Sequence, residues 1–321
     1  MQQVPLGKTG AQVSALCLGC LAFGTTVNEE TAYQLLDQYF EQGGRFLDTA
    51  NNYSFWVNGT SGGESEELLG RWMKDRHNRD EIFLATKVGA RPTIPGATDF
   101  AHIEGLSAQA IEQAIDGSLM RLGTDHIDLY YAHIDDRQTP LEETLEAFER
   151  LIKSGKVRHI GCSNMATWRI AEARTISKAH NLTPYCCVEQ RYSYLRPKPG
   201  AQFGIQVCVD DGLLDYCNTH DDFALLAYSP LLSGSYTRQD VNIPQQYLGA
   251  DSTARLEALH KVAHELGVSE NQVVLAWLLQ STPRAIPIIA ASHSEQLSEN
   301  LAALKVQLSA EQIKLLTEAT A

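Results

Sequence analysis

Eight short apolar segments recur along the chain, and each is followed by a stretch with the periodicity of an amphipathic helix. The apolar segments are 15–20, 45–50, 81–88, 126–133, 157–164, 186–192, 223–230 and 284–291. Strands that alternate with helices predict a parallel sheet, because each parallel pair needs a crossover connection. Eight such units in 321 residues predict a closed α/β structure, the (β/α)8 TIM barrel.

An open, doubly wound sheet is the alternative α/β architecture. It would carry a GxGxxG turn after its first strand, whereas the first apolar segment here ends in GCLAFG (19–24). No linker rich in Pro, Gly or Ser divides the chain, so we expect one barrel domain over residues 1–321. The opening stretch VPLGKTGAQVS (4–14) predicts an N-terminal β-hairpin, which would close the bottom of the barrel.

Three helix starts carry capping signals. Thr139-Pro140-Leu141-Glu142 has the form of a capping box with proline at the first helical position, and Gly155 is expected to end that helix. Ser269 with Gln272, and Ser309 with Gln312, predict two further capping boxes.

Composition narrows the possible partners. The net charge of -13 argues against a nucleic-acid or anionic-membrane partner, because both need a basic surface. No stretch reaches the roughly 18 apolar residues of a membrane-spanning helix, and no secretion signal opens the chain. The cysteine count of 7 is odd, which favours reduced thiols. We therefore expect a cytoplasmic protein whose partners are small molecules; its oligomeric state is not readable from the sequence.

Unusual polar residues gather at the ends of the predicted strands. Singly, each has a structural explanation, since lysines often snorkel to the surface and histidines often serve as hydrogen-bonded scaffold. In a barrel, however, the carboxyl ends of all strands meet on one face, where active sites lie. The residues concerned are Asp48, Tyr53, Lys87, His133, Ser163, Asn164, Gln190 and Tyr228.

This constellation resembles the aldo-keto reductase family over nearly the whole chain. The segments that carry the resemblance are LDTANNY (47–53), GESEELLG (63–70), LATKVG (84–89), DLYYAH (128–133), GKVRHIGCSN (155–164), LAYSPL (226–231) and SEQLSEN (294–300). The resemblance implies a hydride transfer between a nicotinamide cofactor and an aldehyde, ketone or sugar/polyol. It further implies a catalytic tetrad of Asp48, Tyr53, Lys87 and His133, with Tyr53 as the general acid.

The residue types suit that chemistry. Hydride addition builds negative charge on a carbonyl oxygen, and a proton donor must meet it. A phenol, with an ordinary pKa near 10, is a weak acid, and we expect the Lys87 ammonium to lower the pKa of Tyr53. Asp48 would hold the lysine charged and in place, and His133 would orient the carbonyl.

The resemblance also implies the cofactor contacts. Ser163, Asn164 and Gln190 would hold the carboxamide, Tyr228 would stack on the nicotinamide, and Ser229, Leu231 and Gly234 would fold over the pyrophosphate. At the adenosine end, the candidates are Ser292, Gln296, Glu299 and Asn300. Members that use NADP usually carry Arg or Lys here, but segment 290–300 has only His293 as a basic residue. Either NAD or NADP is therefore open, and we expect no strong NADP preference.

Two long loops, 54–63 and 193–206, follow strand ends and should lie over the active face. Phe23, Phe55, Trp56 and Tyr192 are the expected substrate lining, with Tyr194 and Phe203 behind them. Aromatic carbonyls and sugars both fit such a lining. The polar loop around Asn58 gives a slight preference for a sugar or polyol, in which case the reaction could run towards oxidation.

Two other classes of function stay open. A metal-dependent barrel enzyme could use His133, Asp135 and Asp136 as ligands, although the first strand offers no ligand residue. An aldo-keto-reductase-like barrel can also serve as a cofactor-binding regulatory subunit. Turnover of carbonyl compounds, as opposed to binding of the cofactor alone, separates that class from an enzyme.

Overall fold

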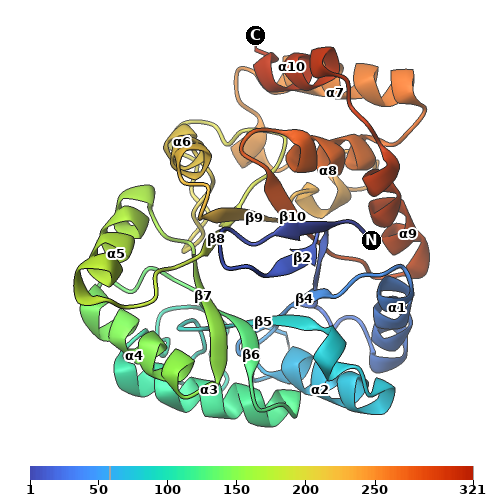
Figure 1. The fold of residues 1–321 in the computed structure, drawn as a ribbon. Helices are drawn as coiled ribbons and strands as arrows, with labels where there is room; N and C mark the ends of the chain where they lie inside the picture. The colour runs from blue at the N-terminus through green and yellow to red at the C-terminus, as the bar shows by residue number, and fades with distance from the viewer. Residues whose placement is uncertain (58, 321) are drawn as a thin grey trace.

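Eight parallel strands close into a barrel in the order β10-β3-β4-β5-β6-β7-β8-β9 (Figure 1). The computed structural model of the chain describes residues 1–57 and 59–320. The barrel strands are β3 (Cys17–Gly19), β4 (Phe46–Asp48), β5 (Phe83–Val88), β6 (Ile127–Ala132), β7 (Val157–Ser163), β8 (Cys187–Arg191), β9 (Ala224–Tyr228) and β10 (Ala285–Ile289). Each lies within one of the apolar segments, so the predicted (β/α)8 barrel is confirmed.

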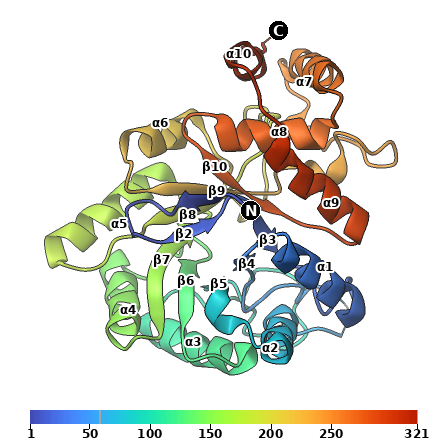
Figure 2. The ribbon, with the colours of Figure 1, turned by 45° about the vertical axis from the view of Figure 1, so that its right-hand side comes forward.

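Helices surround the barrel on its outside (Figures 1 and 2). They are α1 (Glu29–Glu41), α2 (Glu64–Arg76), α3 (Ala108–Leu122), α4 (Leu141–Lys153), α5 (Thr167–His180), α6 (Asp211–Thr219), α8 (Glu270–Gln280) and α9 (Ser294–Ala302). Two further helices, α7 (Ser252–Leu266) and α10 (Ala310–Glu318), pack against each other and against α8. Single 3-10 turns lie at Arg79–Glu81, Leu232–Gly234, Gln245–Tyr247 and Ala303–Lys305.

A hairpin precedes the barrel, as predicted. Strand β1 (Gln3–Pro5) pairs antiparallel with β2 (Gln12–Ser14), and the turn between them uses positive φ at Gly7 and Gly10. The hairpin side chains Val4 and Val13 belong to the same buried cluster as Phe46 at the start of β4. The hairpin therefore closes the amino-terminal end of the barrel, and Figure 1 shows it lying across the strands.

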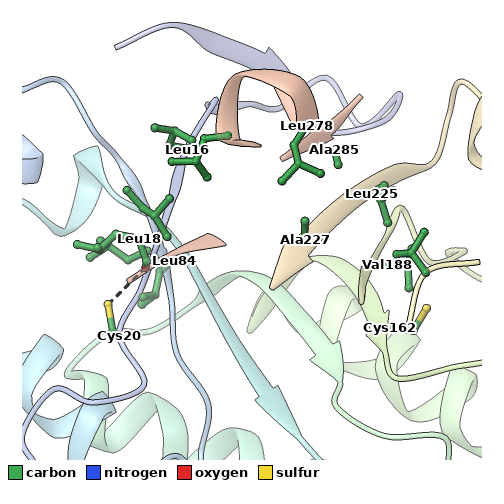
Figure 3. Close-up of a cluster of buried hydrophobic side chains, with 14 of the residues drawn as sticks. Leu16, Leu18, Cys20, Leu84, Cys162, Val188, Leu225, Ala227, Leu278 and Ala285 are labelled. Atoms are coloured by element: carbon green, nitrogen blue, oxygen red, sulfur yellow. Dashed lines mark hydrogen bonds between the residues drawn. The ribbon is translucent and has the colours of Figure 1, made fainter. Parts of the chain in front are cut away.

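Side chains of the strands alternate between two hydrophobic clusters with the period of two that a strand imposes. One set packs under the helices and includes Leu18, Leu84, Val188 and Leu225, all drawn in Figure 3. The adjacent set fills the barrel interior with the hairpin and includes Cys17, Ala85, Cys187 and Leu226. A residue two positions beyond an interior residue also points inward, and this rule decides which polar side chains at the strand ends reach the active face.

Two of the three predicted capping boxes are confirmed, at Ser269 in α8 and at Ser309 in α10. The box predicted at Thr139 is wrong. Pro140 itself is the N-cap residue of α4, with extended backbone and no side-chain cap, so Thr139 lies one position too early. Its hydroxyl instead donates to Asp136 at 2.8 Å. The helix ends as expected, with Gly155 at a φ of 78° just after it.

Candidate active site

Three polar side chains are in direct contact at the carboxyl ends of β4 and β5. The Lys87 ammonium donates hydrogen bonds to the carboxylate of Asp48, to the Tyr53 phenol oxygen at 2.6 Å and to the Thr49 carbonyl at 3.0 Å. The Tyr53 hydroxyl donates to the same Asp48 oxygen at 3.1 Å. The side chain of Lys87 is fully buried and that of Asp48 is 1% exposed. The contacts are therefore shielded from water, which strengthens them.

The phenol of Tyr53 is a weaker acid in this site than the sequence argument predicted. Burial raises the pKa of Tyr53 well above its ordinary value, and the nearby carboxyls of Asp48 and Glu189 raise it further. Burial opposes the charge of Lys87, but the same two carboxyls outweigh it and raise the pKa of Lys87. The predicted lowering of the Tyr53 pKa by Lys87 is overturned, because burial together with the two carboxyls outweighs the effect of the ammonium. Tyr53 is thus a neutral proton donor at neutral pH, held by a charged lysine.

His133 follows β6 and faces the same group. Its ring lies edge-on to the Tyr53 ring, with centroids 6.0 Å apart. Burial, helped by the positive charge of Lys87, lowers the pKa of His133 well below its ordinary value. Its Nδ1 is buried without a hydrogen-bond partner in the part of the chain that the structure describes. A neutral imidazole of this kind can hydrogen-bond a ligand without adding charge.

Two neighbouring residues of β8, Glu189 and Gln190, point to opposite sides of the strand. Gln190, the predicted carboxamide contact, has the phase of Val188 and lies outside the barrel interior. Its amide accepts from the Met165 backbone N–H at 3.3 Å and donates to the Met165 carbonyl at 3.1 Å. Glu189 has the phase of Cys187, points inward and lines the cavity, 3.5 Å from the Lys87 ammonium. Sequence reasoning missed Glu189, although strand alternation, once phased, would have found it.

Asn164 joins several elements of the active face. Its side-chain N–H groups donate to the His133 carbonyl and to the Ser163 hydroxyl, each at 3.0 Å. Its side-chain oxygen accepts from the Tyr228 hydroxyl at 2.7 Å and from the Val207 N–H at 3.2 Å. The predicted residues Ser163, Asn164 and Tyr228 therefore come together on the cavity wall. The contacts tie the ends of β6, β7 and β9 to the long loop after β8.

The loop after β9 forms the next part of the wall, and the predicted residues Ser229, Leu231 and Gly234 all line the cavity. Three residues of this loop other than glycine have positive φ: Ser229 at 52°, Leu232 at 47° and Ser233 at 61°. Such backbone is costly for residues with a Cβ, by roughly 1–3 kcal/mol each, and clusters at ligand-binding segments.

Of the predicted adenosine contacts, one lines the cavity and three are not among its lining residues. Gln296 of α9 lines the cavity. Ser292, Glu299 and Asn300 are not among the lining residues, and their role as adenosine contacts stays a prediction. Glu299 accepts from the Ser269 hydroxyl at 2.5 Å, and Asn300 donates to the Ala290 carbonyl at 3.1 Å. Both side chains thus hold α9 against its neighbours.

The cavity over these residues has a volume of about 630 Å³. Of the predicted substrate lining, Trp56 borders it and is 40% exposed. Phe55 lies beneath, 3% exposed, with its ring 5.0 Å from that of Trp56 and 5.1 Å from that of Phe100. Phe100 and Phe203 line the cavity directly. The sequence predicts Phe203 only in a second row, and Phe100, which lies in the loop after β5, is not among the predicted lining residues.

Two other predicted lining residues are placed elsewhere. Phe23 is 1% exposed and belongs to the core under the helices. Tyr192 packs with its ring 5.8 Å from Trp277 and borders a different cavity of about 720 Å³. Tyr194 lies beside it and is fully buried. Asn58, on which the preference for a sugar rested, lies outside the described residues.

Comparison with known proteins identifies the family. A model of the aldo/keto reductase family matches residues 15–321. The chain belongs to the aldo/keto reductase family. It is 32% identical to the uncharacterised oxidoreductase YrpG of Bacillus subtilis (strain 168), over 99% of this chain and 95% of that protein. It is 28% identical to an aryl-alcohol dehydrogenase (NADP+) of Phanerodontia chrysosporium, over 96% and 83% of the two chains. A crystal structure of a thermostable aldo-keto reductase in complex with epalrestat matches with a TM-score of 0.76 and 29% identity, over 98% of each chain.

The family assignment makes this aldo-keto reductase an oxidoreductase that uses a nicotinamide cofactor and acts on carbonyl compounds. Its cavity fits an extended dinucleotide, because the lining runs from the tetrad past Ser163 and Tyr228 to the loop after β9 and on to Gln296. Buried polar atoms that lack a hydrogen-bond partner within the described residues border this cavity, among them Nδ1 of His133 and Oε2 of Glu189. Within residues 1–57 and 59–320, the charged side chains on the lining are acidic or histidine.

The metal-dependent class receives no support from the described residues, because these contain no group of three or more His, Cys, Asp and Glu side chains arranged to hold a metal ion. Of the candidate ligands, Asp135 is bound by Arg137 and Arg169, and Asp136 accepts from the Leu106 N–H. No helix in the described part of the chain is long and apolar enough to cross a bilayer.

Proposed function

We propose that the aldo-keto reductase reduces an aldehyde or ketone on an apolar, ring-bearing compound, with Tyr53 as the proton donor. The observation that carries this proposal is the contact of the Tyr53 phenol with the buried Lys87 ammonium at 2.6 Å, at the base of an open cavity. A bound nicotinamide cofactor supplies the hydride. Tyr53 supplies the proton to the oxygen atom, and the charged lysine stabilises the phenolate that remains.

The remaining tetrad members have supporting roles in this proposal. Asp48 holds Lys87 charged and in place from the end of β4. Neutral His133 hydrogen-bonds the carbonyl oxygen, which places that oxygen beside the Tyr53 hydroxyl. Because His133 carries no charge, it does not compete with the phenol for the developing negative charge.

The aromatic rings at the cavity entrance support an apolar substrate. Trp56, Phe100 and Phe203 offer flat apolar faces, together with Leu21 and Ile205. Ring-bearing carbonyl compounds gain more from these faces than sugars do, because a sugar would have to bury hydroxyls against hydrocarbon. The name of the aryl-alcohol dehydrogenase among the relatives points in the same direction. This proposal replaces the slight preference for a sugar or polyol.

We further propose that the enzyme uses NADH and NADPH without a strong preference. Segment 290–300 carries no arginine or lysine. A bidentate guanidinium is the strongest device for holding a 2′-phosphate, and without one the discrimination between the two cofactors is small.

The decisive experiment follows oxidation of NADH and of NADPH by absorbance with a panel of aromatic and aliphatic aldehydes and ketones. Tyr53→Phe should lower kcat by roughly 10²–10⁴-fold, the usual contribution of a general acid. Tyr192→Phe is the matched control, because that ring packs on Trp277 away from the cavity. Full turnover in Tyr53→Phe would remove Tyr53 from the chemistry. Cofactor binding without turnover of any carbonyl by the wild type would favour the regulatory class.

A further inference from the structure

A second buried carboxyl beside the tetrad, that of Glu189, has no role in the chemistry proposed so far. Glu189 is 3% exposed, and its Oε2 atom lacks a hydrogen-bond partner in the described residues. Oδ2 of Asp48 is buried and without a partner in the same way. Both carboxyls contact the Lys87 ammonium, Asp48 by a hydrogen bond and Oε2 of Glu189 at 3.5 Å. Two carboxylates beside one ammonium repel each other, and a proton held between them removes that repulsion and supplies the missing hydrogen bond.

The charge state of Glu189 depends on the titratable side chains around it. These are Cys17 from β3, Asp48 from β4, Tyr53 from the loop after β4, Lys87 from β5, Tyr131 from β6 and Tyr228 from β9. Burial raises the pKa of the cysteine and of the three tyrosines, so these four stay neutral. One ammonium, Lys87, is therefore left to balance two carboxyls.

Contact geometry decides which carboxyl keeps the negative charge. Asp48 accepts hydrogen bonds from both Lys87 and Tyr53. Glu189 lies farther from the same ammonium, with its Oε2 atom 3.5 Å from Nζ of Lys87. Burial, together with the neighbouring Asp48 charge, raises the pKa of Glu189 to about 8. A neutral Glu189 can donate a hydrogen bond to the Asp48 carboxylate, which leaves one anion for one cation.

We propose that Glu189 is a positioning residue that shares a proton with Asp48 and thereby keeps Lys87 directed at Tyr53. This inference rests on the proposed function of Tyr53 as the proton donor. When Glu189 loses its proton, a second anion competes for the ammonium and opposes formation of the Tyr53 phenolate. Carbonyl reduction therefore slows as the pH rises through the alkaline range.

The Glu189→Gln variant tests the proposal, because an amide has the shape of the neutral acid and also offers one donor side and one acceptor side. In the wild type, kcat for reduction should fall severalfold between about pH 6 and about pH 9. In Glu189→Gln this fall should be absent. The same fall in both proteins would overturn the proposal, as would a variant inactive at about pH 6, which would mean that Glu189 must carry a charge or transfer a proton itself.

Thermal unfolding of the cofactor-free protein gives a second readout. The pKa of Glu189 is higher in the folded state, about 8, than its ordinary value of 4.5, so the folded state holds an extra proton and loses stability as the pH rises between these values. Glu189→Gln lacks this loss of stability. The Tm of the variant minus the Tm of the wild type should therefore increase from about pH 6 to about pH 9. A Tm difference that does not change with pH would overturn the proposal.

Glu149→Gln is the matched control. Glu149 is 9% exposed, and although burial opposes its charge, hydrogen bonds from Thr183 lower the pKa of Glu149. It is ionised throughout the tested range, so its variant should show a constant Tm difference. If the wild type reduced no carbonyl, the proposed function would fail, whereas the unfolding experiment would still report the shared proton.

Discussion

Replacing Lys87 with methionine removes the single cation of the tetrad while keeping an unbranched side chain of similar length. The side chain of Lys87 is fully buried. Asp48, Tyr53 and the Thr49 carbonyl each lose a hydrogen-bond donor. The Asp48 carboxylate is then a buried charge without a counter-ion.

Breaking a buried ion pair in this way costs about 3–5 kcal/mol. For 321 residues, an unfolding entropy of roughly 2.1 cal/mol/K per residue converts each kcal/mol into about 1.5 °C of Tm. We therefore expect Lys87→Met to lower the Tm by about 4–8 °C at about pH 8. At about pH 5 the loss should be smaller, because an unpaired carboxylate in the folded state can take up a proton there.

Circular dichroism during heating, at both pH values, measures this difference. Lys156→Met is the control, since Lys156 pairs with Asp116 at 2.5 Å on the surface, with side chains 38% and 64% exposed. Such a pair contributes about 0–1 kcal/mol, so its removal should shift the Tm by less than about 1.5 °C. A Lys87→Met protein no less stable than Lys156→Met at about pH 8 would refute the electrostatic account of the site.

Two further predictions address packing and the cofactor. In Gly70→Ala the new Cβ would lie 2.3 Å from the backbone oxygen of Arg121, so α2 and α3 must separate. Denaturant unfolding should show that the free energy of unfolding falls by about 1–3 kcal/mol. In the control Gly117→Ala the new Cβ meets only the flexible Arg121 guanidinium, at 3.1 Å, so the free energy of unfolding should not fall. Gln296→Arg adds a guanidinium to the cavity wall and should shift the ratio of kcat/KM for NADPH over NADH by roughly tenfold or more towards NADPH. An unchanged ratio would place the 2′-phosphate elsewhere.

The sequence by itself determined the barrel and the positions of most polar residues at its active face. Apolar segments alternating with helical ones predict parallel strands, and the carboxyl ends of those strands must meet. Asp48, Lys87 and His133 could therefore be assigned to one face without coordinates. Their proximity follows from the parallel pairing of β4 with β5 and of β5 with β6, which brings the ends of these strands side by side.

The tertiary structure alone decided which of two adjacent polar residues faces inward. Segment 186–192 is flanked by helices on one side and by the barrel interior on the other, so both faces are buried and its sequence shows no alternation. Only packing against the neighbouring strands sets the phase that turns Glu189 inward and Gln190 outward. The tertiary structure alone also decided the acidity of Tyr53, because the pKa of a buried phenol depends on the sum of the charges near it. That sum includes a carboxyl from β8 that is distant in the chain and adjacent only in the closed barrel.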